Sequence, residues 1–148
     1  MKTQALLFLF ESAPYDGEKM REGLEALFAA RIFDIPCTAV LIQDGVYACQ
    51  EGAPEASIKN IHKMLSALPM YDIDQLLIHQ VSAEQRQLKQ VPLNSNGSGA
   101  ETKFISNAEL AILFKQHPHS LSFWNDAAYT ESNPHTLYRL ANMQNVTG

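Results

Sequence analysis

The sequence predicts an α/β protein in which helices flank a mainly parallel sheet. Apolar runs of strand length alternate with longer segments whose apolar residues recur at helical spacing. The strand-length runs are apolar throughout, which is typical of strands that are buried on both faces. A chain of 148 residues with 46% hydrophobic and 18% charged residues fits one globular domain. The alternation of strand and helix then favours a parallel sheet.

The first strand and helix are indicated by an apolar run followed by a helical repeat. Residues 4–10 form a continuous apolar strand. The loop ESAPYDGEK that follows contains proline, aspartate and glycine, which are turn-forming residues. Over residues 18–33, apolar side chains recur at i, i+4, i+7 and i+8 from Met20, so we expect one apolar helical face.

The middle of the chain repeats this strand and helix order. Residues 35–43 are rich in β-branched residues, and an Asp-Gly turn at Gly45 ends this second strand. Residues 53–70 carry apolar residues at helical spacing, and Pro69 is expected to end the helix. Residues 74–80 then form the third strand.

The last part of the domain predicts one more helix and one more strand. Residues 82–90 are polar with modest helical character, and the composition of residues 93–103 predicts a flexible loop. A Ser-x-x-Glu capping box opens a helix over residues 106–116. Residues 119–124 form a short last strand, and the periodicity stops at the extension 125–148.

Charge and cysteine content restrict the partners and the compartment. A net charge of −5 argues against direct nucleic-acid binding and against an anionic membrane surface. The apolar run at residues 5–10 is too short for a signal peptide, and no run reaches membrane-spanning length. Cys37 and Cys49 form no recognised disulfide framework, so we expect a cytoplasmic protein.

The first loop, residues 12–17, lies where doubly wound proteins often bind phosphate. Such a loop needs several glycines or hydroxyl groups around the anion, and this one offers only Ser12 and Gly17. The carboxylates that flank it would repel a phosphate. An ordinary connecting loop is therefore favoured, and a flavodoxin-like module that binds a flavin or nucleotide is the alternative.

The two cysteines differ in how well their positions suit a reactive thiol. Cys37 lies at the start of a strand, away from the edge where such folds place their sites, and is expected to act as a small apolar residue. Cys49 lies in a loop before the second helix, which leaves it a candidate for sulfur or redox chemistry. Its charged neighbours Asp44 and Glu51 would stabilise a thiolate poorly.

Four histidines are weighed as ligands or bases. His117 and His119 have no third ligand nearby in the sequence, so a polar turn is favoured over a metal site. His62 flanks the apolar face of its helix and is expected at the surface. His79 ends the third strand, where a general base, a ligand and a hydrogen-bonded structural group are all open, with the structural role favoured.

Four short motifs, in order and at matching spacing over residues 3–124, give the chain a resemblance to the DsrE/DsrF-like family, and within it to the TusC or DsrF type of subunit. These motifs are Ser12-Ala13-Pro14, Arg21-Glu22-Gly23-Leu24, Asp44-Gly45-Val46 and Tyr71-Asp72-Ile73.

The resemblance implies a three-layer fold in which a mainly parallel five-stranded sheet has helices on both faces. The extension at 125–148 departs from the family's pattern and is expected to be either partly ordered or bound to a partner, whereas the resemblance implies a DsrE-like domain at residues 1–124. It further implies a hetero-oligomer with TusB-like and TusD-like subunits. Such a complex takes persulfide sulfur from a TusA-like carrier and passes it through a TusE-like protein toward 2-thiouridine in tRNA. No cofactor and no metal are implied, and a homo-oligomer of the isolated chain stays open.

The resemblance also bears on His79, because the sulfur-carrying cysteine of related subunits lies at the end of the third strand. Imidazole cannot hold a persulfide, so the resemblance implies a scaffold subunit without catalytic residues. Cys49 and His79 remain the alternative catalytic candidates, as a persulfide acceptor with a nearby base. A subunit of the DsrE, DsrF and DsrH type in sulfur oxidation is the other alternative.

Overall fold

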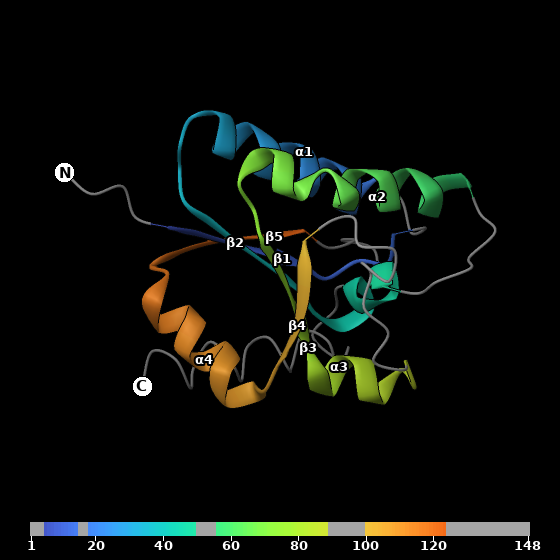
Figure 1. Cartoon of the computed structure of the whole chain (residues 1–148). Helices are drawn as coiled ribbons and strands as arrows, with labels where there is room; N and C mark the ends of the chain where they lie inside the picture. The colour runs from blue at the N-terminus through green and yellow to red at the C-terminus, as the bar shows by residue number, and fades with distance from the viewer. Residues whose placement is uncertain (1–4, 15–17, 50–55, 89–99, 124–148) are drawn as a thin grey trace.

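The structure, a computed structural model, describes residues 5–14, 18–49, 56–88 and 100–123 (Figure 1). Two of its helical elements, η1 and η2, are 3₁₀ helices. In chain order the elements are β1 (Leu6–Phe10), α1 (Lys19–Ile32), β2 (Cys37–Leu41), η1 (Gln43–Cys49), α2 (Ala56–Ser66), η2 (Leu68–Tyr71), β3 (Gln75–His79), α3 (Gln80–Gln85), β4 (Glu101–Ile105), α4 (Asn107–Gln116) and β5 (His119–Phe123).

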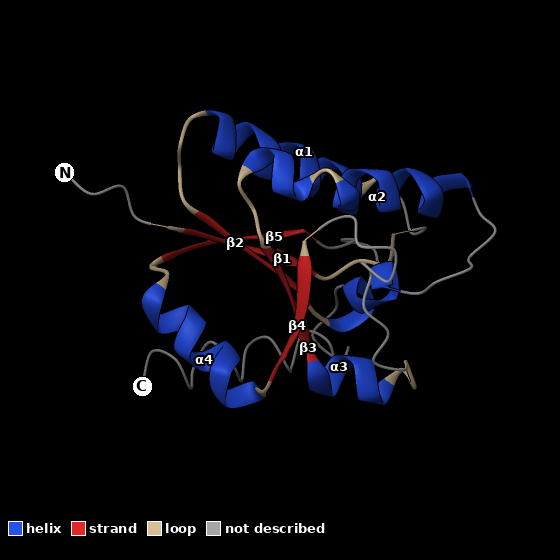
Figure 2. Cartoon of the chain, in the orientation of Figure 1, coloured by secondary structure: helices blue, strands red, loops and turns tan. Residues whose placement is uncertain are grey.

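The five strands form one sheet in the order β4-β3-β2-β1-β5, and every neighbouring pair is parallel. Helices α1 and α2 cover one face of the sheet and α4 covers the other, while α3 continues from the end of β3 (Figure 2). This arrangement confirms the predicted three-layer α/β fold. Because the strands are parallel, the carboxyl ends of β1, β2 and β3 meet at one edge of the sheet.

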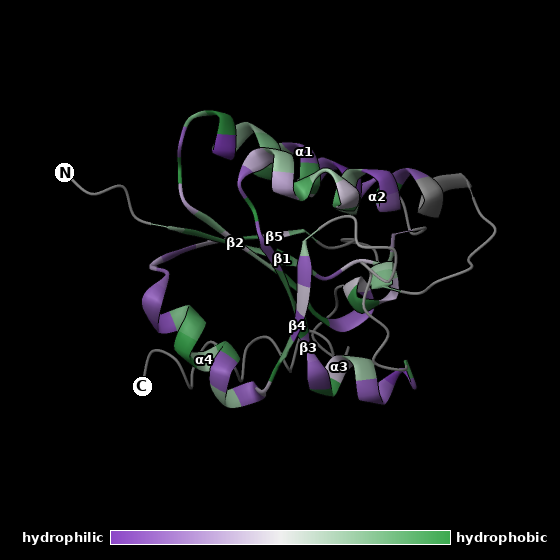
Figure 3. Ribbon diagram, in the orientation of Figure 1, coloured by the Kyte–Doolittle hydropathy of each residue, from purple (hydrophilic) through white to green (hydrophobic). Residues whose placement is uncertain are grey.

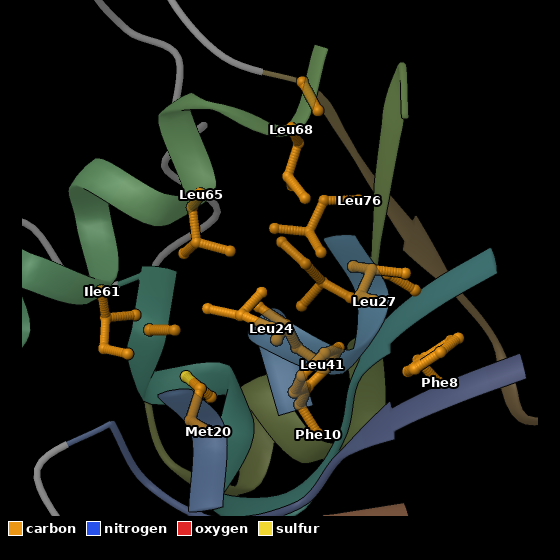
Figure 4. Packing of buried hydrophobic residues seen from close by; sticks show 14 of the residues in the cluster. Phe8, Phe10, Met20, Leu24, Leu27, Leu41, Ile61, Leu65, Leu68 and Leu76 are labelled. Atoms are coloured by element: carbon orange, nitrogen blue, oxygen red, sulfur yellow. The ribbon is translucent and has the colours of Figure 1, made fainter. Parts of the chain in front are cut away.

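Two clusters of buried side chains form the core, one on each face of the sheet. The larger cluster fills the space between the sheet and the α1–α2 layer, with Phe8, Leu24 and Leu76 among its members (Figure 4). The smaller cluster joins the opposite face of the strands to α4 through Leu110. Continuous apolar strands supply both faces, which is why the sequence of β1 shows no alternation.

Two glycines allow elements to approach β1 closely. A Cβ on Gly23 of α1 would lie 2.7 Å from the ring of Phe10 and 2.8 Å from that of Phe123. A Cβ on Gly45 would lie 1.8 Å from the backbone oxygen of Phe10, so η1 can pass over the end of β1 only without a side chain there. These glycines belong to two of the motifs that indicate the family.

Three local predictions were wrong. The sequence predicted that residues 93–103 form a flexible loop, yet residues 101–105 form β4. This is an edge strand whose first residues are hydrophilic (Figure 3). An edge strand alternates in burial and lacks the continuous apolar run on which the prediction relied. The expected Asp-Gly turn at Gly45 is the 3₁₀ helix η1, and α2 ends at Ser66, with Pro69 inside η2.

The remaining elements agree closely with the sequence pattern. The predicted capping box opens α4, where the Ser106 hydroxyl accepts from the Glu109 N–H and the Glu109 carboxylate accepts from the Ser106 N–H. The extension 125–148 lies outside the described residues. None of the helices in the described part of the chain is long and apolar enough to cross a membrane.

Candidate functional site

His79 occupies the carboxyl edge of the sheet as the last residue of β3. Its side chain is 0% exposed, and α3 begins at the next residue. The register pairs His79 with Ile105 of β4, so the strand that leads into α4 ends beside it. The topology therefore surrounds the imidazole with the starts of α3 and α4.

Both ring nitrogens of His79 have hydrogen-bond partners from other elements. Nδ1 lies 2.6 Å from the Ser82 hydroxyl in α3, and Nε2 lies 2.5 Å from Oδ1 of Asn107 at the start of α4. The Ser82 hydroxyl oxygen also accepts from the backbone N–H of Gln43 at 2.9 Å. One imidazole thus connects β3 to α3, α4 and, through Ser82, η1.

The partners assign the proton on His79. An amide oxygen only accepts, so Nε2 carries the hydrogen and donates to Asn107. The Ser82 hydroxyl then donates to Nδ1 while its oxygen accepts from Gln43. Burial lowers the pKa of His79, and the charge of Arg86 lowers it further, against an opposing effect of the Asn107 hydrogen bond. A neutral imidazole with both nitrogens engaged presents no lone pair to a substrate or a metal.

Arg86 holds the elements around His79 in place. Its guanidinium donates to the Gln43 side-chain oxygen at 3.1 Å, to the Asp44 carboxylate at 2.9 Å and to the Ser82 carbonyl at 3.1 Å. Gln43 has a φ of 51°, a left-handed conformation that is uncommon for a residue with a side chain. The hydrogen bonds of Arg86 therefore connect this strained start of η1 to α3.

The structure places Cys49 at the end of η1, not in the loop that the sequence predicted. Its side chain is half-buried against the larger core cluster. Burial raises the pKa of the Cys49 thiol to about 12, so the thiol is protonated at neutral pH. The two ring nitrogens of His79 face Ser82 and Asn107, so neither is directed at Cys49 as a base.

His62 and His117 both have structural bonds. His62 was expected at the surface but is half-buried, and its Nε2–H donates to the Ala48 carbonyl at 2.9 Å, which joins α2 to η1. His117 is buried at the end of α4, where its Nδ1–H donates to the Leu113 carbonyl at 2.7 Å. The Thr38 hydroxyl donates to the other nitrogen of His117 at 2.9 Å. His117 therefore lies in the predicted connection between the last helix and the last strand, but its side chain is buried there.

The other sequence candidates lie apart from His79. Cys37 is the first residue of β2, so it lies at the amino-terminal ends of the strands, opposite to His79. Its thiol donates to the Ile35 carbonyl at 3.2 Å, and burial raises the pKa of the thiol. His119 is the exposed first residue of β5. Among the described residues, no group of three histidine, cysteine or acidic side chains could hold a metal ion.

The first loop is described only in part. Ser12 is buried just beyond β1, and its hydroxyl has no hydrogen-bond partner within the described part of the chain. Gly17, the other residue weighed for phosphate binding, lies outside the described residues. A flavin or nucleotide at this loop therefore stays an untested alternative.

Sequence reasoning identified His79 but missed its partners. Ser82 carries one usable signal, because a residue three positions after His79 lies above it once α3 begins. Asn107 is 28 residues away in sequence and becomes a neighbour only because β4 pairs with β3. Its position directly after the predicted cap of α4 is the one local hint.

Residues 4–123 match the model of the DsrE/DsrF-like family, which is most of the chain. The chain belongs to the DsrE/DsrF-like family. Three curated relatives, each named as a TusC homologue, indicate the TusC type within it. The protein from Vibrio vulnificus strain CMCP6 is 32% identical over 120 residues, which cover 80% of this chain and 98% of that protein.

The other two relatives match shorter stretches. The Vibrio parahaemolyticus protein is 38% identical over 60% of this chain and 76% of its own length, and the Pseudomonas aeruginosa protein is 31% identical over 58% and 74%. Among solved structures, the ychN protein of E. coli aligns with a TM-score of 0.67 over 81% of this chain and 99% of that one. At 20% identity it supports the fold alone.

Proposed function

We propose that this chain is a non-catalytic subunit of a cytoplasmic sulfur-relay complex, in which it associates with TusB-like and TusD-like partners. The complex would receive persulfide sulfur from a TusA-like carrier and pass it through a TusE-like protein toward 2-thiolation of the tRNA wobble uridine. Membership of the DsrE/DsrF-like family and the TusC-type relatives support this class of function.

The observation that carries the proposal is the state of His79. The sulfur-bearing cysteine expected at this position in related subunits is replaced by a buried imidazole whose nitrogens bind Ser82 and Asn107. A sulfur carrier needs an accessible thiolate at such a point. This side chain instead joins three elements, so its contribution is to the shape of the subunit.

Co-expression tests the assembly. The full chain would be expressed with TusB-like and TusD-like chains from the same genome, and the mixture separated by size-exclusion chromatography. We expect one joint complex in which all three chains elute together. Separate elution of this chain in every combination would contradict the proposal.

The competing function, a sulfur carrier that uses Cys49, predicts a different measurement. The intact chain would be incubated with a persulfide donor and its mass determined, with Cys49→Ala and Cys37→Ala as matched variants. We expect no gain of sulfur on the native chain, because the protonated, half-buried thiol of Cys49 is a poor nucleophile. A mass gain that disappears only in Cys49→Ala would replace the scaffold proposal with a carrier.

The end product distinguishes tRNA thiolation from sulfur oxidation. Deletion of the gene in its own host should lower the 2-thiouridine content of bulk tRNA, measured by nucleoside mass spectrometry, and the His79→Gln gene should restore it. Unchanged 2-thiouridine together with impaired sulfur oxidation would favour a subunit of the DsrE, DsrF and DsrH type.

A further inference from the structure

Strand β5 leaves one edge of the sheet without a partner strand in the described part of the chain. It carries no charged Lys, Arg, Asp or Glu, and Leu121 at its centre is 44% exposed. The opposite edge strand, β4, presents exposed Glu101 and Lys103, charges of the kind that protect an edge against pairing. The two edges of this sheet therefore differ in how open they are to another strand.

The hydrogen bonds to β1 establish which backbone groups of β5 point outward. The Phe123 carbonyl accepts from the Glu11 N–H at 3.0 Å, so Phe123 directs its backbone groups toward β1. The direction of the backbone N–H and C=O groups alternates from residue to residue along a strand. The backbone groups of Leu121 therefore also point toward β1, while those of Ser120 and Ser122 point away from the sheet.

The sequence of β5, His-Ser-Leu-Ser-Phe, is nearly symmetric about Leu121. We propose that β5 is a self-association surface, through which two copies of this chain pair antiparallel about a two-fold axis at Leu121. Ser120 of each copy then lies opposite Ser122 of the other, and His119 lies opposite Phe123. This register needs residues with outward-pointing backbone groups at its hydrogen-bonded pairs, and the two serines are those residues.

This register satisfies the backbone and the side chains together. Each of the two Ser120–Ser122 pairs exchanges two N–H···O=C bonds, and Leu121 meets its counterpart in the closer, non-hydrogen-bonded kind of pair. The two leucines lie on the same face and cover each other's exposed surface. The buried Ser122 hydroxyl has no hydrogen-bond partner among the residues that the structure describes.

The pairing of two five-residue strands is a small interface, at the low end of the size range of specific complexes. The dimer is therefore expected to be weak and to form at high micromolar concentration. The inference rests on the edge of the sheet and does not depend on the sulfur-relay function. If the experiments contradict one of the two proposals, the other is not affected.

Light scattering coupled to size-exclusion chromatography tests the surface on the full chain alone. We expect the mass to rise toward that of a dimer with increasing concentration. Leu121→Lys places two like charges opposite each other and should weaken dimerisation about tenfold or more. The matched control Ile112→Lys changes a side chain that is 52% exposed on α4 and should have no effect. A monomer at every concentration, or equal behaviour of the two variants, would overturn the proposal.

A disulfide test examines the register and does not depend on the stability of Leu121→Lys. The Leu121→Cys variant should form a dimer through its introduced thiol under mild oxidation, because the two Cα atoms at this position would lie about 4.5 Å apart. Ser120→Cys is the control, since position 120 faces position 122 and its own counterpart lies about 7–8 Å away or more. Peptide mass spectrometry identifies the linked residues and separates them from Cys37 and Cys49. Equal cross-linking of both variants, or none at Leu121→Cys, would overturn the two-fold register.

Discussion

Replacement of His79 by alanine should destabilise the whole domain, although no step of sulfur chemistry is assigned to this residue. The imidazole is 0% exposed and is bonded at both nitrogens. Its removal leaves a cavity among the ends of β3, α3 and α4. It also leaves the Ser82 hydroxyl without its acceptor, while the exposed Asn107 can turn to water.

The magnitude follows from these losses. Truncation of a large buried side chain costs about 2–5 kcal/mol, and each lost hydrogen bond costs about 1 kcal/mol. Partial collapse of the cavity and hydration of Asn107 reduce the total, so we expect the free energy of unfolding to fall by about 3–5 kcal/mol. Asn107→Ala should cost about 1–3 kcal/mol, because it leaves the Nε2–H of the buried His79 without its acceptor.

Urea unfolding followed by circular dichroism measures these values, and a double-mutant cycle isolates the bond between the two side chains. We expect a coupling of about 1 kcal/mol between His79→Ala and Asn107→Ala. The assignment of His79 as the link between these elements would be refuted by a cost below about 1 kcal/mol for His79→Ala. Strict additivity of the two variants would refute the bond itself.

Three further predictions concern pH, packing and thiol reactivity. The folded-state pKa of His79 lies below its ordinary value of 6.5, so its contribution to stability is fully present above that pH and is lost as pH falls toward the folded pKa. His79→Gln should flatten this loss in urea titrations, and an unchanged slope would contradict it. Gly45→Ala should cost more than about 3 kcal/mol, because the new Cβ meets a backbone oxygen at 1.8 Å. Gly23→Ala meets only side-chain rings and should cost less in the same assay, so the reverse order would contradict the packing. Burial raises the pKa of Cys49 to about 12, so iodoacetamide should alkylate it at pH 7 far more slowly than it alkylates a free thiol, and an equal rate would contradict its burial.

The strands and helices that the sequence predicted well are those with a strong local pattern. The apolar run of β1 and the cap of α4 at Ser106 and Glu109 each express one physical cause within a few residues. β4 was missed because an edge strand needs apolar residues on only part of its surface, and a glycine-rich segment precedes it. The 3₁₀ helix at Gly45 was missed because its cause is a tertiary contact with the carbonyl of Phe10.

The candidate site divides in the same way. The place of His79 at a strand end could be predicted from a run of apolar residues that stops. Its bond to Asn107 could not, because the pairing of β3 with β4 brings the two together across 28 residues. For Cys49 the sequence predicted a poorly stabilised thiolate from the charges beside it, whereas in the structure packing against the core raises the pKa of its thiol.

The proposal that this chain is a scaffold and not a sulfur carrier rests on incompatible demands at one position. A carrier cysteine must be exposed enough to meet its donor and must be held as a thiolate. A residue that joins β3 to α3 and α4 must be buried, and its hydrogen-bonding groups must all be satisfied. His79 meets the second set of demands in full, and Arg86 extends the same network to η1. A rigid carboxyl edge of this kind suits a subunit that positions a partner's reactive sulfur, and the cost of losing His79 should therefore appear first in folding and assembly.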